Sequence, residues 1–123
     1  MIKKKILVLP FASTSIISGP TLATNASDLL LTMGFDDDGQ KRSINLRFVK
    51  QRAFRKRSES YCTEWHVTGV FDTVCEIQDS DWIDELNSAP ANQNRGKWIM
   101  RHFMIYVDSF GCLEVVAESV AID

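Results

Sequence analysis

The chain is poor in the residues that cross-link small secreted folds. It contains three cysteines in 123 residues, Cys62, Cys75 and Cys112, and no CxxC pair. An odd, irregularly spaced set is not typical of a disulfide framework or a structural zinc site. A chain of this length buries enough apolar surface to fold without such cross-links. We therefore expect one globular domain over residues 1–123 in the reducing cytoplasm, with Cys75 and Cys112 as small core residues.

Long hydrophobic runs are also absent. No segment approaches the roughly eighteen consecutive apolar residues of a transmembrane helix, so we expect no membrane partner. Residues 1–26 resemble a bacterial signal peptide in their three lysines, short apolar run and following small residues. Pro10 interrupts that run, which favours a first strand over residues 3–9 and leaves export as the alternative.

The common catalytic and cofactor-binding motifs are missing as well. The chain has no phosphate-binding glycine loop, no HExxH, no GxSxG and no EF-hand loop. The DDDG at residues 36–39 lacks the alternating ligands and the distant glutamate of a calcium loop. Asp38-Gly39 is instead typical of a two-residue hairpin turn. We accordingly predict no cofactor and no catalytic residues.

Hydrophobic alternation at a period of two residues is what the chain does have. It is clearest in residues 28–35 and 42–49, on either side of the Asp38-Gly39 turn, and it indicates half-buried antiparallel strands. Further strand-length segments cover residues 3–9, 53–58, 63–77, 98–107 and 112–117, and Gly19-Pro20 predicts a break after the first of them. Residues 63–77 should form one long strand or two strands bent at Gly69. In residues 112–117 the apolar residues alternate with Glu114, which should therefore face water. The pattern predicts an α+β, mainly β domain of about seven antiparallel strands, as a curved sheet or a small sandwich.

One segment, residues 79–88, has helical spacing instead. Asp79 or Ser80 can cap its first turn, and Trp82 and Leu86 lie four residues apart on one face. So short a helix is marginal alone in water, so we expect its Trp82 face to dock on the sheet. The sequence thus predicts one short helix.

Acidic residues are absent from residues 40–57, which hold eight of the fourteen basic residues of a chain whose net charge is −2. Because Ile44, Leu46 and Phe48 alternate with polar residues, most of these cations should face water. The alternation breaks at residues 50–52, where we predict a bulge or loop between two strands.

The nearest approach to a reactive site is the set Cys62, Glu64 and His66. On an extended strand these three side chains point to one face, and His102 lies on a different strand. Two histidines, a carboxylate and a thiolate could hold Zn²⁺, or a His–Glu pair could act as acid and base. The same alternation is typical of the wet face of a strand, so a metal-dependent or His/Glu enzyme is our second alternative.

The lack of a catalytic constellation favours a non-catalytic module that binds another protein. In size and composition the chain is similar to small immunity proteins and phage-type inhibitors that neutralise a partner. The first alternative is a nucleic-acid-binding domain that uses residues 41–57, although the acidic pI of about 5.6 disfavours it. The candidate partner-binding residues are Asp79, Asp81, Asp84 and Glu85 at the helix start, and Lys50, Arg52, Arg55 and Arg57 in the basic stretch.

Overall fold

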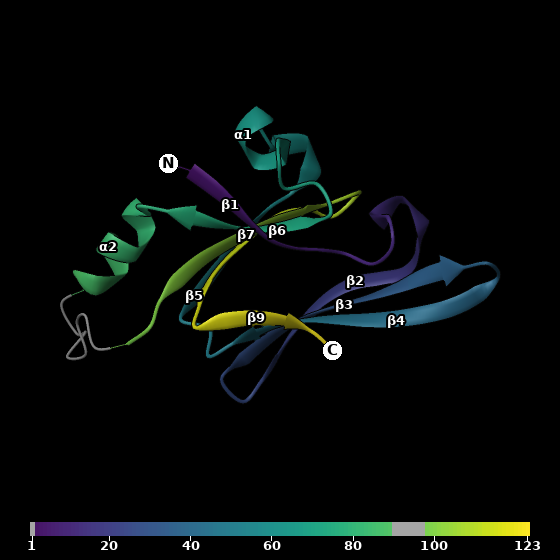
Figure 1. The fold of residues 1–123 in the computed structure, drawn as a ribbon, viewed down its shortest axis with the longest axis horizontal. Helices are drawn as coiled ribbons and strands as arrows, with labels where there is room; N and C mark the ends of the chain where they lie inside the picture. Colours follow the sequence, from purple (N-terminus) through teal and green to yellow (C-terminus); the bar gives the residue numbers. More distant parts are fainter. Residues whose placement is uncertain (1, 90–97) are drawn as a thin grey trace.

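A computed structural model of the protein describes residues 2–89 and 98–123. In these ranges the chain forms nine strands in two antiparallel sheets around a shared hydrophobic core (Figure 1). The predicted mainly β fold is confirmed. The strands are β1 Ile2–Val8, β2 Ile16–Asn25, β3 Asp28–Asp37, β4 Gln40–Val49, β5 Ala53–Arg57, β6 Thr73–Gln78, β7 Arg101–Val107, β8 Gly111–Ala117 and β9 Ser119–Ile122. The short α-helices are α1 Glu64–Val67 and α2 Asp81–Asn87, and 3-10 turns lie at Ser13–Ser15 and Glu59–Tyr61.

The two sheets are joined by strands that pass from one to the other. Sheet A has the order β1-β6-β7-β8-β5, and sheet B has the order β2-β3-β4-β9. β4 continues into β5 and β8 continues into β9, so two antiparallel runs of chain change sheets side by side. We refer to this place, residues 50–52 and 117–118, as the corner.

The corner contains the predicted break in alternation. Val49 pairs with Ser119 and Ala53 with Val116, so residues 50–52 lie opposite only residues 117–118. The extra residue is accommodated by Lys50, which has a φ of 51°. Such bulges let a strand pair bend sharply from one sheet into another. The prediction of a bulge or loop between the two strands is confirmed.

The main core lies between the two sheets. On β3 and β4 the alternation predicted from sequence is observed, with Leu31, Phe35 and Phe48 buried. They pack against Phe103, Leu113 and other residues on the inner face of sheet A. The turn between β3 and β4 has positive φ at both Asp38 and Gly39, as the predicted two-residue hairpin requires.

The outer face of sheet A carries a second, smaller core beneath α1. The prediction of one long strand over residues 63–77, or of two strands bent at Gly69, is wrong in its first half, because Glu64–Val67 is helical and β6 begins only at Thr73. The side chain and backbone of Thr63 both interact with His66, forming a capping box that favours a helical turn over extension. The second core comprises Val70, Cys75, Ile77, Met104, Tyr106 and Cys112, with Val67 and Cys62 packed against it.

Three other expectations need correction. β2 was expected to break at Gly19-Pro20, yet it continues through a register shift, which proline permits because β2 is an edge strand. The strand expected over residues 98–107 begins at Arg101, leaving Trp98 exposed. Finally, β8 is buried along its whole length, because strands and helices cover both faces of sheet A. A further strand, β9, follows it directly.

A first strand and a signal peptide were the two alternatives considered for the N-terminal segment. In the structure Ile2–Val8 forms a strand, β1, which pairs with β6. α2 confirms the predicted helix, with Ser80 as its N-cap. Among the residues described, no helix has the length and apolar character needed to cross a membrane.

Replacing Gly111 tests the packing of β8 against β5. Gly111 has a φ of 113°, and a Cβ there would lie 2.1 Å from the carbonyl oxygen of Arg57. We expect Gly111→Ala to lower the free energy of unfolding by about 3 kcal/mol or more, measured by urea denaturation. Gly39→Ala is the matched control, because Gly39 also has a positive φ but nothing within 4 Å, and should cost about 1 kcal/mol. Equal losses would contradict the clash.

Candidate functional site

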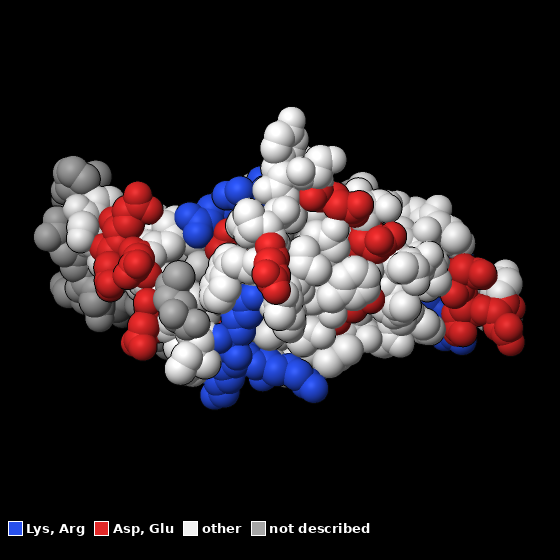
Figure 2. Space-filling model, turned by 90° about the horizontal axis from the view of Figure 1, so that it is seen from above, with Lys and Arg blue, Asp and Glu red and all other residues white. Residues whose placement is uncertain are grey.

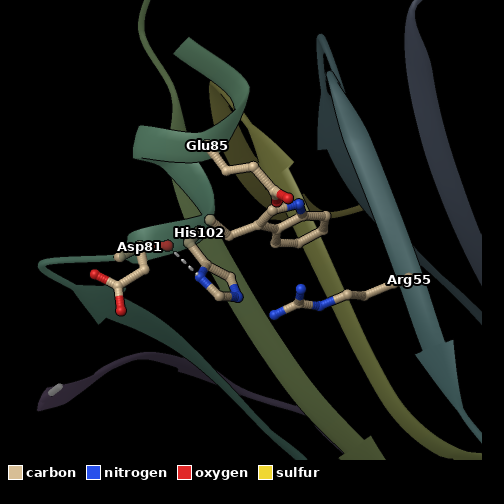
Figure 3. A pocket seen from close by; sticks show the side chains of 6 residues that line it. Arg55, Asp81, Glu85 and His102 are labelled. Carbon is tan, nitrogen blue, oxygen red and sulfur yellow. Dashed lines mark hydrogen bonds between the residues drawn. The ribbon is translucent and has the colours of Figure 1, made fainter. Parts of the chain in front are cut away.

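Polar side chains gather on the outer face of sheet A beside α2 (Figure 3). Ser80 Oγ lies 2.7 Å from His102 Nδ1, and His102 Nε2 lies 2.8 Å from Glu114 Oε1. Arg55 completes the chain by donating from Nε and Nη2 to the Glu114 carboxylate at 3.0 and 3.1 Å. We refer to these four side chains as the Arg55 network.

Strand register and helix capping place the network. Arg55 on β5 lies directly opposite Glu114 on β8, and His102 comes from β7 on the other side of β8. Ser80 Oγ also accepts the backbone N–H of Ile83 at 3.3 Å, so it caps α2. Trp82 packs edge-on against the His102 ring at 5.2 Å, and the Arg55 guanidinium lies 4.1 Å from the Trp82 ring centroid. The network therefore ties α2 to three strands.

The electrostatics keep Glu114 ionised. Burial by itself raises the pKa of the Glu114 carboxyl, but hydrogen bonds from His102 and Arg55 outweigh burial and lower that pKa to about 2. With a charged carboxylate, a neutral His102 that carries its proton on Nε2 donates to Glu114 and accepts from the Ser80 hydroxyl. The Ser80 hydroxyl and both ring nitrogens of His102 then have hydrogen-bond partners.

A Ser–His–Glu chain also suggests the chemistry of a hydrolase, and an open cavity of about 380 Å³ lies beside it. The geometry argues for a structural role. Ser80 is buried and already accepts a backbone N–H as a helix cap. The Glu114 charge is shared with Arg55, which reduces its ability to stabilise a protonated His102. We interpret the network as a support for α2 and β5.

The four candidate metal ligands lie in two places, three of them at α1 and His102 in the Arg55 network. His66 Nδ1 accepts the backbone N–H of Thr63 at 2.9 Å within the α1 cap, whereas His102 belongs to the Arg55 network. Cys62 and Glu64 lie before and within α1, not on the extended strand that was expected. Within residues 2–89 and 98–123, no group of three or more His, Cys, Asp and Glu side chains is arranged to hold a metal ion.

The cysteines are placed as structural residues. Cys75 and Cys112 are buried, as predicted. Burial raises the pKa of both thiols, that of Cys112 to about 12, so the reactive thiolate forms are scarce near neutral pH. Cys62 is half-buried, and its Sγ lies 3.5 Å from the carbonyl oxygens of Arg57 and Ser58.

The basic stretch is only partly neutralised by the acidic remainder of the chain. Four of its eight cations form ion pairs, namely Arg42 with Asp37, Arg47 with Asp28 and Asp123, Lys50 with Glu118, and Arg55 with Glu114. In the described part of the chain, Lys41, Arg52, Lys56 and Arg57 have no carboxylate within ion-pair distance. Three of these four lie in β5 or directly before it.

The acidic and basic candidate residues lie close together in space. Figure 2 shows acidic side chains over α2 and over the tip of the β3–β4 hairpin, and both acidic and basic side chains between these two ends. The predicted acidic residues Asp79, Asp81, Asp84 and Glu85 are all exposed. The predicted acidic and basic surfaces are therefore neighbours that meet where Arg55 stacks on Trp82.

Sequence analysis missed the Arg55 network. The alternation on β8 placed Glu114 on a wet face, and nothing local in the sequence links it to Arg55, 59 residues away. The available signal was indirect: His102 and Glu114 are polar residues within the two most apolar strands, where unpaired polar groups are costly. No protein-family model, curated protein or solved structure matches the chain.

Removing the Ser80 hydroxyl tests the support of α2. We expect Ser80→Ala to reduce the free energy of unfolding by about 2 kcal/mol, because the helix loses its cap and buried His102 loses a partner. Ser88→Ala at the other end of α2 removes an exposed hydroxyl bonded to Asp84 and should cost less than about 0.5 kcal/mol. Urea denaturation measures both. A catalytic serine is indicated instead if a fluorophosphonate probe labels Ser80 and stability is unchanged in Ser80→Ala.

The low pKa of Glu114 predicts a stability change in acid. Its folded-state pKa of about 2 lies below the ordinary 4.5, so its contribution is present above about pH 4.5 and is lost as the pH falls toward 2. Because solvent screens the exposed Arg55 end, we expect a contribution of about 1–2 kcal/mol. The difference in unfolding free energy between wild type and Glu114→Gln should shrink over that range in urea denaturation. A difference independent of pH would contradict the ionised network.

Proposed function

We propose that the protein is a non-catalytic protein-binding module, of the immunity or inhibitor type, and that its partner docks along β5. One observation carries the proposal. Within the described residues β8 is the one strand that pairs with β5, and no strand pairs with its other edge. An unpaired edge offers backbone N–H and C=O groups to an extended segment of another protein, which adds a strand to the sheet.

The charge on β5 selects the kind of partner. Lys56 and Arg57, together with Arg52 just before the strand, have no ion-pair partner among the described residues. A second copy of β5 would bring like charges together, whereas an acidic segment would face opposite ones. We therefore infer that the partner presents an extended segment rich in Asp and Glu.

β5 is better suited to binding than β1, the other edge of sheet A. β1 carries Lys3, Lys4 and Lys5 and a bulge, the features by which edge strands avoid pairing. β5 has arginines and half-exposed aromatic rings beside it, and interfaces are enriched in Arg, Trp, Tyr and Phe but depleted in Lys. Phe54 is 44% exposed and Tyr61 75% exposed, so apolar contact area is available at this edge.

The fold holds β5 ready for a partner. The bidentate contact of Arg55 with Glu114 fixes the strand to β8, and Trp82 covers the guanidinium. A preformed edge requires less ordering on binding, which favours affinity. The exposed acidic side chains of α2 lie next to this edge, so a partner that covers both surfaces needs basic groups opposite α2.

Nucleic-acid binding has weaker support. Half of the basic stretch is paired with carboxylates, and the rings of Trp65, Trp82, Trp98 and Phe110 are each already stacked with a cation. Those faces are not open to bases in the free protein. Steeply salt-dependent binding of single-stranded RNA, together with no selection of acidic peptides, would favour this alternative.

Selection from a random heptapeptide display library tests the proposal. We expect enriched peptides to alternate Asp or Glu with apolar residues, and binding of the synthetic peptides, measured by fluorescence anisotropy, to weaken roughly tenfold or more in Lys56→Glu/Arg57→Glu. N-methylation of alternate peptide nitrogens should abolish binding for one parity only, because a strand directs every second N–H toward its partner.

The matched control is Lys4→Glu/Lys5→Glu, which makes the same charge change on β1. If both double variants weaken binding equally, the attraction is unspecific and β5 is not the docking edge. A selection that yields no acidic peptides, or binding that tolerates N-methylation at either parity, also contradicts strand addition.

A further inference from the structure

Two arginine–tryptophan stacks lie at β5, one on the strand and one just before it. The Arg55 guanidinium lies 4.1 Å from the Trp82 ring centroid, and the Arg52 guanidinium lies 3.8 Å from that of Trp98. Figure 3 shows the Arg55 side chain of the first stack extending from β5 toward α2. In both pairs the ring covers one face of the guanidinium, and the N–H groups at the guanidinium edges form its hydrogen bonds.

The two arginines differ in what their edges contact. Arg55 uses Nε and Nη2 to hold both oxygens of Glu114, the side-on pairing that matches a carboxylate. Arg52 Nε is buried and has no hydrogen-bond partner among the residues that the structure describes. Buried donors without acceptors are rare in folded proteins, and an unmet donor at a surface cavity indicates a ligand.

An open cavity of about 470 Å³ adjoins Arg52 at the corner. Lys50 also lines the cavity, but it forms an ion pair with Glu118, with 3.6 Å between Lys50 Nζ and Glu118 Oε2. The apolar wall is formed by Trp98, 48% exposed, and Ile99, 60% exposed. A planar cation beside an exposed apolar wall suits a carboxylate on a short aliphatic stem, and nearby Glu118 disfavours a doubly charged phosphate.

We propose that Arg52 and Trp98 form a binding site for a glutamate or aspartate side chain of the segment that docks on β5. The proposal rests on the function proposed above and specifies one contact of it. Arg52 directly precedes β5, so a strand added along β5 can place one of its acidic residues at the cavity. Because Arg52 Nε is covered in the free protein, the half-exposed Trp98 or Ile99 side chain has to turn aside as the carboxylate enters.

Glu118 is an internal candidate partner for the Arg52 edge, because it lines the same cavity, but it is paired with Lys50. A switch of Glu118 from Lys50 to Arg52 would account for the unpartnered Arg52 Nε without an external ligand. This explanation therefore has to be tested. Glu118→Gln removes it. If the site serves an external carboxylate, this variant should bind the probe described next at least as tightly as wild type.

Nuclear magnetic resonance with glutarate as the probe tests the site without any peptide. We expect glutarate to shift the Arg52 Nε–H and Trp98 indole N–H signals in a saturable manner, at a concentration at least tenfold lower than that which shifts Arg42 Nε–H. Arg42 is the matched control, since it is an exposed arginine paired with Asp37. Neutral glutaramide should have no effect, and Arg52→Lys should remove the Trp98 response because lysine lacks the planar fork.

Each other outcome has a defined meaning. Equal responses of Arg52 and Arg42, or none at Arg52, would overturn the site, and tighter binding of inorganic phosphate than of glutarate would overturn its assignment to a carboxylate. If selected peptides bind β5 but are insensitive to Arg52→Lys, and to Glu→Gln at every peptide position, the site fails while the proposed function stands. If glutarate binds at Arg52 but no acidic peptide is selected, docking along β5 fails.

Discussion

The corner at residues 50–52 is the constraint on which the rest of the structure depends. Two antiparallel runs of chain leave one sheet and enter the other at this point, held by backbone hydrogen bonds from Arg52 to Val116 and from Glu118 to Val49. Because both sheets share these runs, their inner faces are turned toward each other and enclose one core. An extra residue on the β4–β5 side makes the bend possible.

The same bend creates the edge to which we assign function. Before the corner, β4 pairs with β3 on one edge and with β9 on the other. After the corner, β8 is the one strand among the described residues that pairs with β5. The chain thus exposes a strand edge at the C-terminal end of its most basic segment, residues 40–57, and the corner places Arg52 beside an open cavity. The Arg55 network supports the strand from behind, so a rigid, cationic edge follows from the way the sheets are joined.

The candidate site was only partly predictable. The break in alternation at residues 50–52 correctly marked an irregular place, because cations cannot occupy core-facing positions of a continuous strand. Which cations are neutralised was beyond sequence analysis, since Arg55 meets Glu114 through the pairing of β5 with β8. The interpretation of Cys62, Glu64 and His66 as side chains on one face of a strand was wrong, because local capping makes Glu64–Val67 a helix, α1.

The sequence by itself determined the features that depend on neighbouring residues. Alternation and Asp38-Gly39 specify the β3–β4 hairpin, and Ser80 followed by an apolar stripe specifies α2, because these signals act within one turn or one strand. Only the tertiary structure decided that β2 passes Gly19-Pro20, that β9 crosses to sheet B, and that no strand of residues 2–89 and 98–123 pairs with the second edge of β5. Such outcomes depend on which distant strand pairs with a segment and buries it. Hydrophobic periodicity does not predict that strand, because it reports only on the segment itself.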